Sequence, residues 1–124
     1  MKVRIYNNSI RLRLSRSEVA EFQATGLVEE RLEFGPEMLK MFRCALVRED
    51  AAEAVTARYL PGIIEIAVPP SVESRWSNSD QVAIEGSYTR GERPISISIE
   101  KDFECLHQPV DPAADAFPNP GAAR

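Results

Sequence analysis

Residues 2–14 read KVRIYNNSIRLRL, and this stretch decides the fold. Apolar and polar residues alternate on both sides of Asn7-Asn8, and asparagine tolerates the positive φ that a two-residue hairpin turn requires. The sequence therefore predicts a β-hairpin with one aliphatic face and one basic face. With the asparagines at the turn, the predicted cross-strand pairs are Tyr6 with Ser9, Ile5 with Ile10, Arg4 with Arg11, Val3 with Leu12, and Lys2 with Arg13.

A capping box follows the hairpin. Ser15 and Glu18 have the S-x-x-E spacing in which each side chain reaches the backbone N–H of the other residue. Gly26 supplies a left-handed stop, because glycine adopts positive φ without a steric penalty. We expect a short helix that ends near Thr25.

The rest of the chain reads as further strands and one more short helix. Pro69-Pro70-Ser71 opens that helix, and Pro61-Gly62 occupies the centre of a type II turn. Glu30 falls on the apolar side of its strand, so the alternation there is imperfect. Extended segments are predicted at 28–34, 38–47, 54–59, 63–68, 82–85 and 95–99.

This order of elements defines the expected fold class. The connections are short and suit hairpins, whereas parallel βαβ units need longer crossovers. We therefore expect an α+β fold, with a mainly antiparallel sheet or half-open barrel of about seven to eight strands and two short helices. Residues 1–106 form one such domain, and no internal repeat is visible. Residues 107–124 form a tail rich in proline and alanine, which is expected to dock partly through Phe117.

Composition limits the class of protein. The chain has 124 residues, enough for one core, and its apolar runs are too short to span a bilayer. The N-terminus lacks the apolar segment of a secretory signal, so we expect a cytoplasmic protein without a membrane segment. Cys44 and Cys105 lie among apolar neighbours and read as buried, reduced thiols rather than nucleophiles. His107 is the single histidine, and no cofactor or metal site is predicted.

Charge is segregated along the chain. The net charge is −4, which makes nucleic acid an unlikely partner. Residues 1–16 nevertheless contain five basic residues and no acid, while the remainder carries ten basic and nineteen acidic residues. The basic side of the hairpin, called the basic face from here on, is the candidate anion-binding site. It consists of Lys2, Arg4, Arg11 and Arg13.

Two interpretations of the basic face stay open. Like charges opposite one another destabilise a strand pair unless something negative lies among them. The sheet itself can supply that negative charge, in which case the pairs are exposed and each contributes only ~0–1 kcal/mol. Alternatively, the arginines bind a phosphate- or carboxylate-bearing ligand or an acidic protein partner. The sheet residues suited to the first role are Glu29, Glu33, Glu65, Glu85 and Glu100.

Three stretches carry a resemblance to a known family. Residues 8–19 (NSIRLRLSRSEV), 77–86 (SNSDQVAIEG) and 99–106 (IEKDFECL) resemble, in order and spacing, a family of small bacterial proteins described only as a domain of unknown function. The likeness extends to Asp115 and to Phe117-Pro118-Asn119-Pro120. The resemblance implies a bacterial, cytoplasmic, single-domain protein and carries over no catalytic residue.

The sequence does not establish what the protein does. The leading hypothesis is a non-enzymatic binding or interaction module that accepts an anion on the basic face. The alternative is a small enzyme that acts on a phosphorylated or carboxylated substrate in a polar sheet cavity. In that case Arg11 and Arg13 clamp the substrate, and Glu85 or Glu100 acts as the acid or base. The sequence leaves the oligomeric state undetermined.

Overall fold

The computed structural model describes residues 1–103 and residue 117. Its elements follow the predicted order, with eight strands and two α-helices in that part of the chain. The elements are β1 (Lys2–Tyr6), β2 (Ser9–Leu14), α1 (Arg16–Thr25), β3 (Leu27–Glu33), the 3₁₀ turn η1 (Met38–Lys40), β4 (Met41–Arg48), β5 (Thr56–Leu60), β6 (Ile63–Val68), α2 (Pro70–Ser77), β7 (Ala83–Tyr88) and β8 (Ile95–Lys101).

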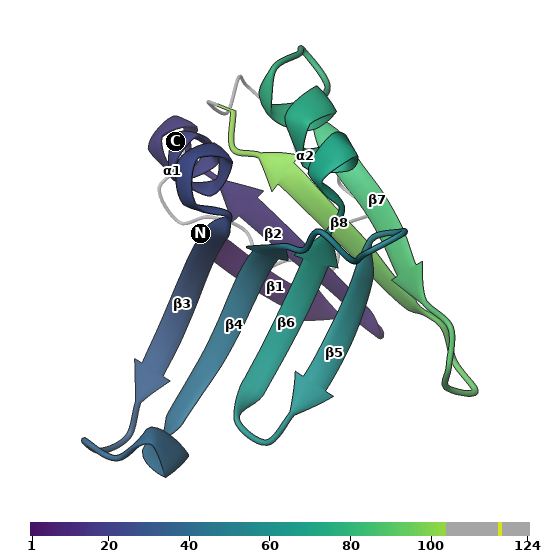
Figure 1. Cartoon of the computed structure of the whole chain (residues 1–124). Coiled ribbons are helices and arrows are strands. Elements are labelled where there is room, and N and C mark those ends of the chain that lie inside the picture. The colour runs from purple at the N-terminus through teal and green to yellow at the C-terminus, as the bar shows by residue number, and fades with distance from the viewer. Residues whose placement is uncertain (104–116, 118–124) are drawn as a thin grey trace.

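The strands divide into two sheets of four, with the orders β1-β2-β8-β7 and β3-β4-β6-β5. Figure 1 shows the sheets as two layers whose strands run in different directions, with α1 and α2 together at one end. The predicted α+β class, consisting mostly of sheet, is confirmed. The predicted single sheet or half-open barrel is not, because the hydrogen-bonded pairs form two separate ladders.

The central pair of each sheet is parallel, which the sequence did not predict. β2 pairs with β8 and β4 pairs with β6 in parallel, while the outer pairs are antiparallel. The prediction assumed that a parallel pair needs a long helical crossover. Here the chain passes from β4 to β6 through β5, so that a strand of the same sheet forms part of the connection.

The topology contains a repeat that the sequence does not show. A hairpin–helix–hairpin unit occurs twice, first from β1 to β4 around α1 and then from β5 to β8 around α2. The equivalent strands of the two units are β1 and β5, β2 and β6, β3 and β7, and β4 and β8. When each strand is replaced by its equivalent, the strand order of one sheet becomes that of the other. Each unit gives one hairpin to each sheet, so neither unit alone contains a complete sheet.

The first hairpin has the predicted register at all five pairs. Asn7 and Asn8 have φ values of 47° and 58°, as a two-residue turn with positive φ at both positions requires. Ile10, Leu12 and Leu14 of β2 are at most 5% exposed and belong to the core. The alternation that predicted the hairpin therefore also decides which face is buried.

The two helices close one end of the core. In α1 the capping box of Ser15 and Glu18 is complete, and Gly26 ends the helix with a φ of 75°. Phe22 of α1 and Trp76 of α2 are fully buried, and the Trp76 indole N–H donates to the Val82 carbonyl at 3.1 Å. An aromatic side chain of this size contributes to stability through the large apolar area that it removes from water.

Smaller differences from the prediction concern loops. The turn at Pro61-Gly62 is confirmed, with a φ of 78° at Gly62. Met38–Lys40 forms η1 instead of extending the next strand, because the Lys40 N–H donates back to the Glu37 carbonyl at 2.9 Å. The predicted tail 107–124 lies outside the described residues except for Phe117, which is 98% exposed. Docking of the tail stays a prediction.

One close contact joins the two sheets at the edge where β5 and β7 meet. Val55, just before β5, packs against Gly86 of β7 so closely that a Cβ added at Gly86 would lie 2.6 Å from Val55 Cγ1. Only a residue without a side chain permits this approach. The two sheets are therefore in direct contact at Gly86.

We predict that Gly86→Ala lowers the free energy of unfolding by about 1–3 kcal/mol, the usual cost of overpacking a core. Urea denaturation measures this change. Gly91→Ala is the matched control, because its added Cβ would have its nearest neighbour at 3.7 Å. Equal denaturation midpoints for the two variants would contradict the close contact.

Candidate functional site

The basic face lies on the outer side of the β1–β2 hairpin. Successive side chains of a strand point to opposite sides, so the burial of Ile10, Leu12 and Leu14 directs the residues between them outward. The structure brings all four predicted residues together around a shallow hollow of about 210 Å³. The hollow is lined by Lys2, Val3, Arg4, Arg11 and Arg13.

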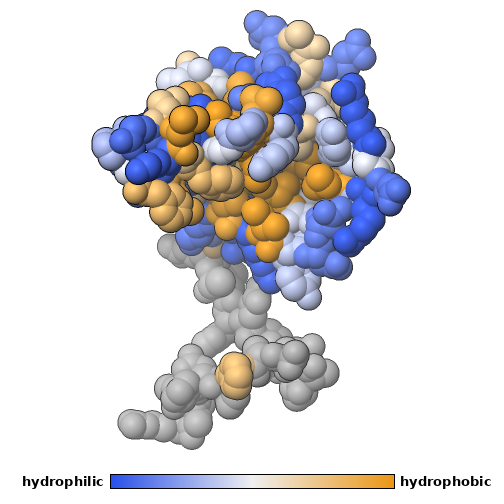
Figure 2. All heavy atoms as spheres, turned by 90° about the horizontal axis from the view of Figure 1, so that it is seen from below, coloured by the Kyte–Doolittle hydropathy of each residue, from blue (hydrophilic) through white to orange (hydrophobic). Residues whose placement is uncertain are grey.

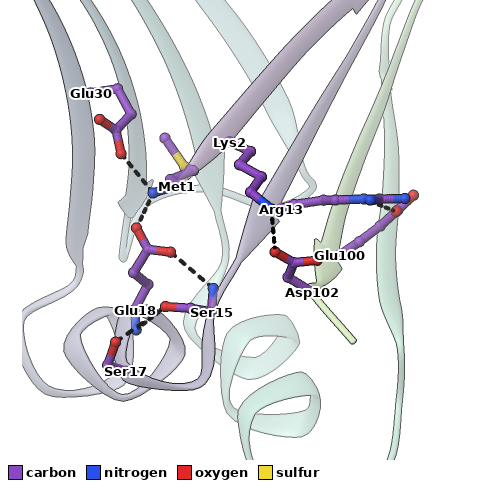
Figure 3. A network of polar contacts seen from close by, with 9 residues as sticks. All are labelled: Met1, Lys2, Arg13, Ser15, Ser17, Glu18, Glu30, Glu100 and Asp102. Atoms are coloured by element: carbon purple, nitrogen blue, oxygen red, sulfur yellow. Dashed lines mark hydrogen bonds and ion pairs between the residues drawn. The ribbon is translucent and has the colours of Figure 1, made fainter. Parts of the chain in front are cut away.

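Glu100 of β8 supplies one negative charge to this face. The parallel register places Glu100 level with Arg13, and its carboxylate lies 3.5 Å from Arg13 Nε and 3.2 Å from Arg11 Nε. The Ser98 hydroxyl donates to the same carboxylate at 2.9 Å. Two guanidinium groups therefore share one glutamate, and Figure 3 shows its contact with Arg13.

Asp102 supplies the second negative charge. The Lys2 ammonium lies 2.9 Å from the Asp102 carboxylate, as Figure 3 shows. Its hydrogen bond with Lys2 is the main cause of the lowered pKa of Asp102, and the charge of Arg13 adds to the effect. Because the pKa is lowered, the pair persists at neutral pH and is lost only as the pH falls below the ordinary value of 3.8.

Arg4 has no carboxylate within ion-pair distance among the described residues. Its guanidinium instead lies over the ring of Tyr6, 5.8 Å from the ring centre. Four cationic side chains therefore face two carboxylates, with Arg11 and Arg13 sharing Glu100.

Of the five glutamates expected to neutralise the basic face, Glu100 alone does so. Glu29 and Glu65 belong to the other sheet, where they pair with arginines of that sheet. Glu33 and Glu85 form no ion pair within the described residues. Strand alternation correctly predicted that these side chains point away from the core, but it cannot assign a residue to one of two sheets.

A second polar network holds the start of β1 in place. The Met1 ammonium is buried and contacts the carboxylate of Glu18 and that of Glu30, the latter at 2.6 Å. Glu18 also completes the capping box by accepting from the Ser15 N–H at 2.9 Å. Figure 3 shows these contacts side by side with the Lys2 and Arg13 pairs. Glu30 lies on the apolar side of β3 because it binds this ammonium, which the imperfect alternation did not reveal.

A larger cleft lies between the open ends of the two sheets and has a volume of about 520 Å³. Figure 2 shows apolar side chains gathered in the middle of this end of the molecule. Sequence reasoning missed the cleft, because strand alternation predicts its isoleucines as ordinary core residues. We call it the apolar cleft, and it is lined by Ile5, Asn8, Ser9, Ile10, Ala57, Arg58, Tyr59, Ile64, Ile66, Tyr88 and Ile95.

The apolar cleft is not the polar cavity that the enzyme hypothesis requires. Arg11 and Glu100 project from the outer side of their sheet, and neither lines the cleft. Glu85 lies in the same outward row as Arg11, with Ser98 between them. The predicted clamp and acid or base residues therefore lie on an open face.

Comparison with protein families gives one match. The model of a family of unknown function, DUF7009, matches residues 1–121. The chain belongs to this family. The predicted resemblance to an uncharacterised domain is thus confirmed, and the family description names no activity that could be transferred to a residue. Neither the curated proteins nor the solved structures compared with the chain gave a match.

Two further findings concern other predicted properties. No helix in the described part of the chain has the length and apolar character needed to cross a membrane. Cys44 is a buried free thiol, and burial together with the charge of Glu30 raises its pKa to about 11. Cys105 and His107 lie outside the described residues.

We predict that Cys44 does not react with a thiol reagent at pH 7.5 in the folded protein, because only the thiolate is nucleophilic. The measurement uses a Cys105→Ser variant, so that Cys44 is the single thiol. Labelling should proceed only after unfolding in guanidinium chloride. Rapid labelling of the folded variant would contradict the burial of Cys44.

Proposed function

We propose that this chain is a non-enzymatic binding module that accepts a phosphate- or carboxylate-bearing ligand, or an acidic partner, on the basic face. The observation that supports the proposal is incomplete neutralisation. Lys2, Arg4, Arg11 and Arg13 surround one hollow, whereas Glu100 and Asp102 are the two carboxylates paired with them in the described residues. An anion in the hollow would relieve the repulsion that remains.

Arg4 is the residue best placed to bind the anion. It is exposed, lines the hollow, and has no competing carboxylate within ion-pair distance in the described residues. Arg11 is opposite Arg4 in the hairpin, and its Nε lies 3.2 Å from the Glu100 carboxylate. The remaining N–H groups of both guanidinium groups can bind oxygen atoms in the bidentate geometry that suits phosphate and carboxylate.

The rigid hairpin favours binding without a large rearrangement. The two-residue turn fixes the register, and the buried side chains of β2 hold the opposite face against the core. The backbone of such a scaffold is already ordered, so it loses little conformational entropy when a ligand binds to the side chains that project from it.

The proposal includes a bacterial, cytoplasmic setting. Cys44, a buried free thiol, supports a reducing compartment, where unpaired thiols persist.

We predict that inorganic phosphate and citrate raise the melting temperature at low ionic strength. We also predict that Arg4→Ala weakens phosphate binding about tenfold. The expected loss reflects hydrogen bonds to a charged group, worth roughly 1.5 kcal/mol or more. Calorimetric titration gives the affinity. Arg90→Ala is the matched control, because it removes the same charge from an exposed loop of the other hairpin in this sheet.

Glu100→Gln tests the same site in the opposite direction. This substitution removes the carboxylate that competes for Arg11 and Arg13, so phosphate should bind more tightly, while stability changes by less than about 1 kcal/mol. No binding by the wild type, or equal affinities for wild type, Arg4→Ala and Arg90→Ala, would refute the proposal.

A further inference from the structure

Strand β1 is an exposed edge of its sheet. Within the described residues it pairs with β2 alone, and all five of its residues are exposed. An edge strand presents unpaired backbone N–H and C=O groups to which a further strand can bind. The sheet can therefore be extended next to the basic face.

The register identifies which backbone groups point to the free side. The Asn8 and Leu14 carbonyls accept from N–H groups of the β8 segment at 3.3 and 2.8 Å, so the even-numbered residues of β2 face β8. The odd-numbered residues of β2 then face β1, because partners alternate along a strand. Val3 and Ile5 oppose even-numbered residues and direct their N–H and C=O groups away from β2. The residues bonded to β2 are Lys2, Arg4 and Tyr6.

The side chains of β1 differ between its two faces. Lys2 and Arg4 project toward the outer side, where the basic face lies. Val3 and Ile5 project toward the inner side, yet they are 37% and 63% exposed. A strand placed beside β1 would thus meet positive charge on one side and uncovered apolar surface on the other.

We propose that β1 binds an extended acidic segment of another protein as an additional strand of the sheet. Carboxylates at alternate positions of the segment lie against Lys2 and Arg4, and the apolar residues between them cover Val3 and Ile5. Backbone hydrogen bonds to Val3 and Ile5 hold the segment, which is strand addition to a free edge. This inference rests on the proposed anion-accepting function and specifies its partner.

Charge disfavours a second copy of this chain as the occupant. If two β1 strands paired antiparallel with Val3 opposite Ile5, Arg4 of one copy would lie directly opposite Arg4 of the other. Like charges directly opposite destabilise a strand pair, whereas opposite charges stabilise it. The cations of β1 therefore select an acidic strand.

A proline substitution separates strand pairing from charge. Ile5→Pro removes the N–H that points to the free edge and leaves the β1–β2 bonds and all four cations in place, and proline is tolerated at such edge positions. Ile5→Ala is the matched control, because it shortens the same side chain but keeps the N–H. The probes are a short peptide of alternating glutamate and valine, a block peptide of identical composition, and inorganic phosphate, each titrated by calorimetry into the full chain.

The alternating peptide should bind Ile5→Ala more weakly than wild type, because alanine offers less apolar surface to cover. It should bind Ile5→Pro at least about tenfold more weakly than Ile5→Ala, and it should bind the wild type more tightly than the block peptide does. Phosphate should bind all three proteins equally. Circular dichroism verifies folding, and Val3→Pro, with Val3→Ala as its control, replaces Ile5→Pro if the latter does not fold.

Two results would overturn the inference and leave the anion site intact. In the first, phosphate binds the wild type but the alternating peptide binds no better than the block peptide. In the second, the alternating peptide binds the proline variant as tightly as the alanine control. Failure of phosphate and of both peptides to bind the wild type would instead refute the proposed function itself.

Discussion

The register of the β1–β2 hairpin is the constraint on which the rest of the structure depends. Asn7 and Asn8 adopt positive φ, so the turn consists of these two residues and Tyr6 pairs with Ser9. Because side chains alternate with a period of two, a slip of one residue would turn the arginines inward and the isoleucines outward. The same register therefore creates the core face, the basic face and the free edge.

The rest of the sheet is built against this hairpin. β8 lies parallel to β2, which brings Glu100 level with Arg13 and places Asp102 near Lys2. The contacts of Met1 with Glu18 and Glu30 tie the beginning of β1 to helix α1 and to strand β3 of the other sheet. Strand β1 is thus held at Met1, the residue before it, and along β2, while its other edge pairs with no strand of the described residues.

Local signals in the sequence predict local structure well. The hairpin register, the capping box of Ser15 and Glu18, the Gly26 stop and the Pro61-Gly62 turn each depend on neighbouring residues, and the structure confirms all four. The composition of the basic face was predictable for the same reason.

The relations between distant elements were not predictable from the same signals. Alternation shows that Glu29, Glu65 and Glu100 point away from the core. It does not show that, of these three residues, Glu100 alone lies in the sheet of the basic face. The parallel central pairs and the repeat of the hairpin–helix–hairpin unit depend on how hairpins combine, which no local pattern encodes. The apolar cleft arises between two sheets, and its lining residues come from six different strands and the first hairpin turn.

Amide hydrogen exchange of β1 in the free, full-length chain, measured by NMR, tests the central claim most directly. The register predicts that the amides of Arg4 and Tyr6, bonded to β2, exchange slowly and that those of Val3 and Ile5 exchange rapidly. Slow exchange at Val3 and Ile5 would contradict the account, because it would mean that the edge of β1 is already covered or that the hairpin has a different register.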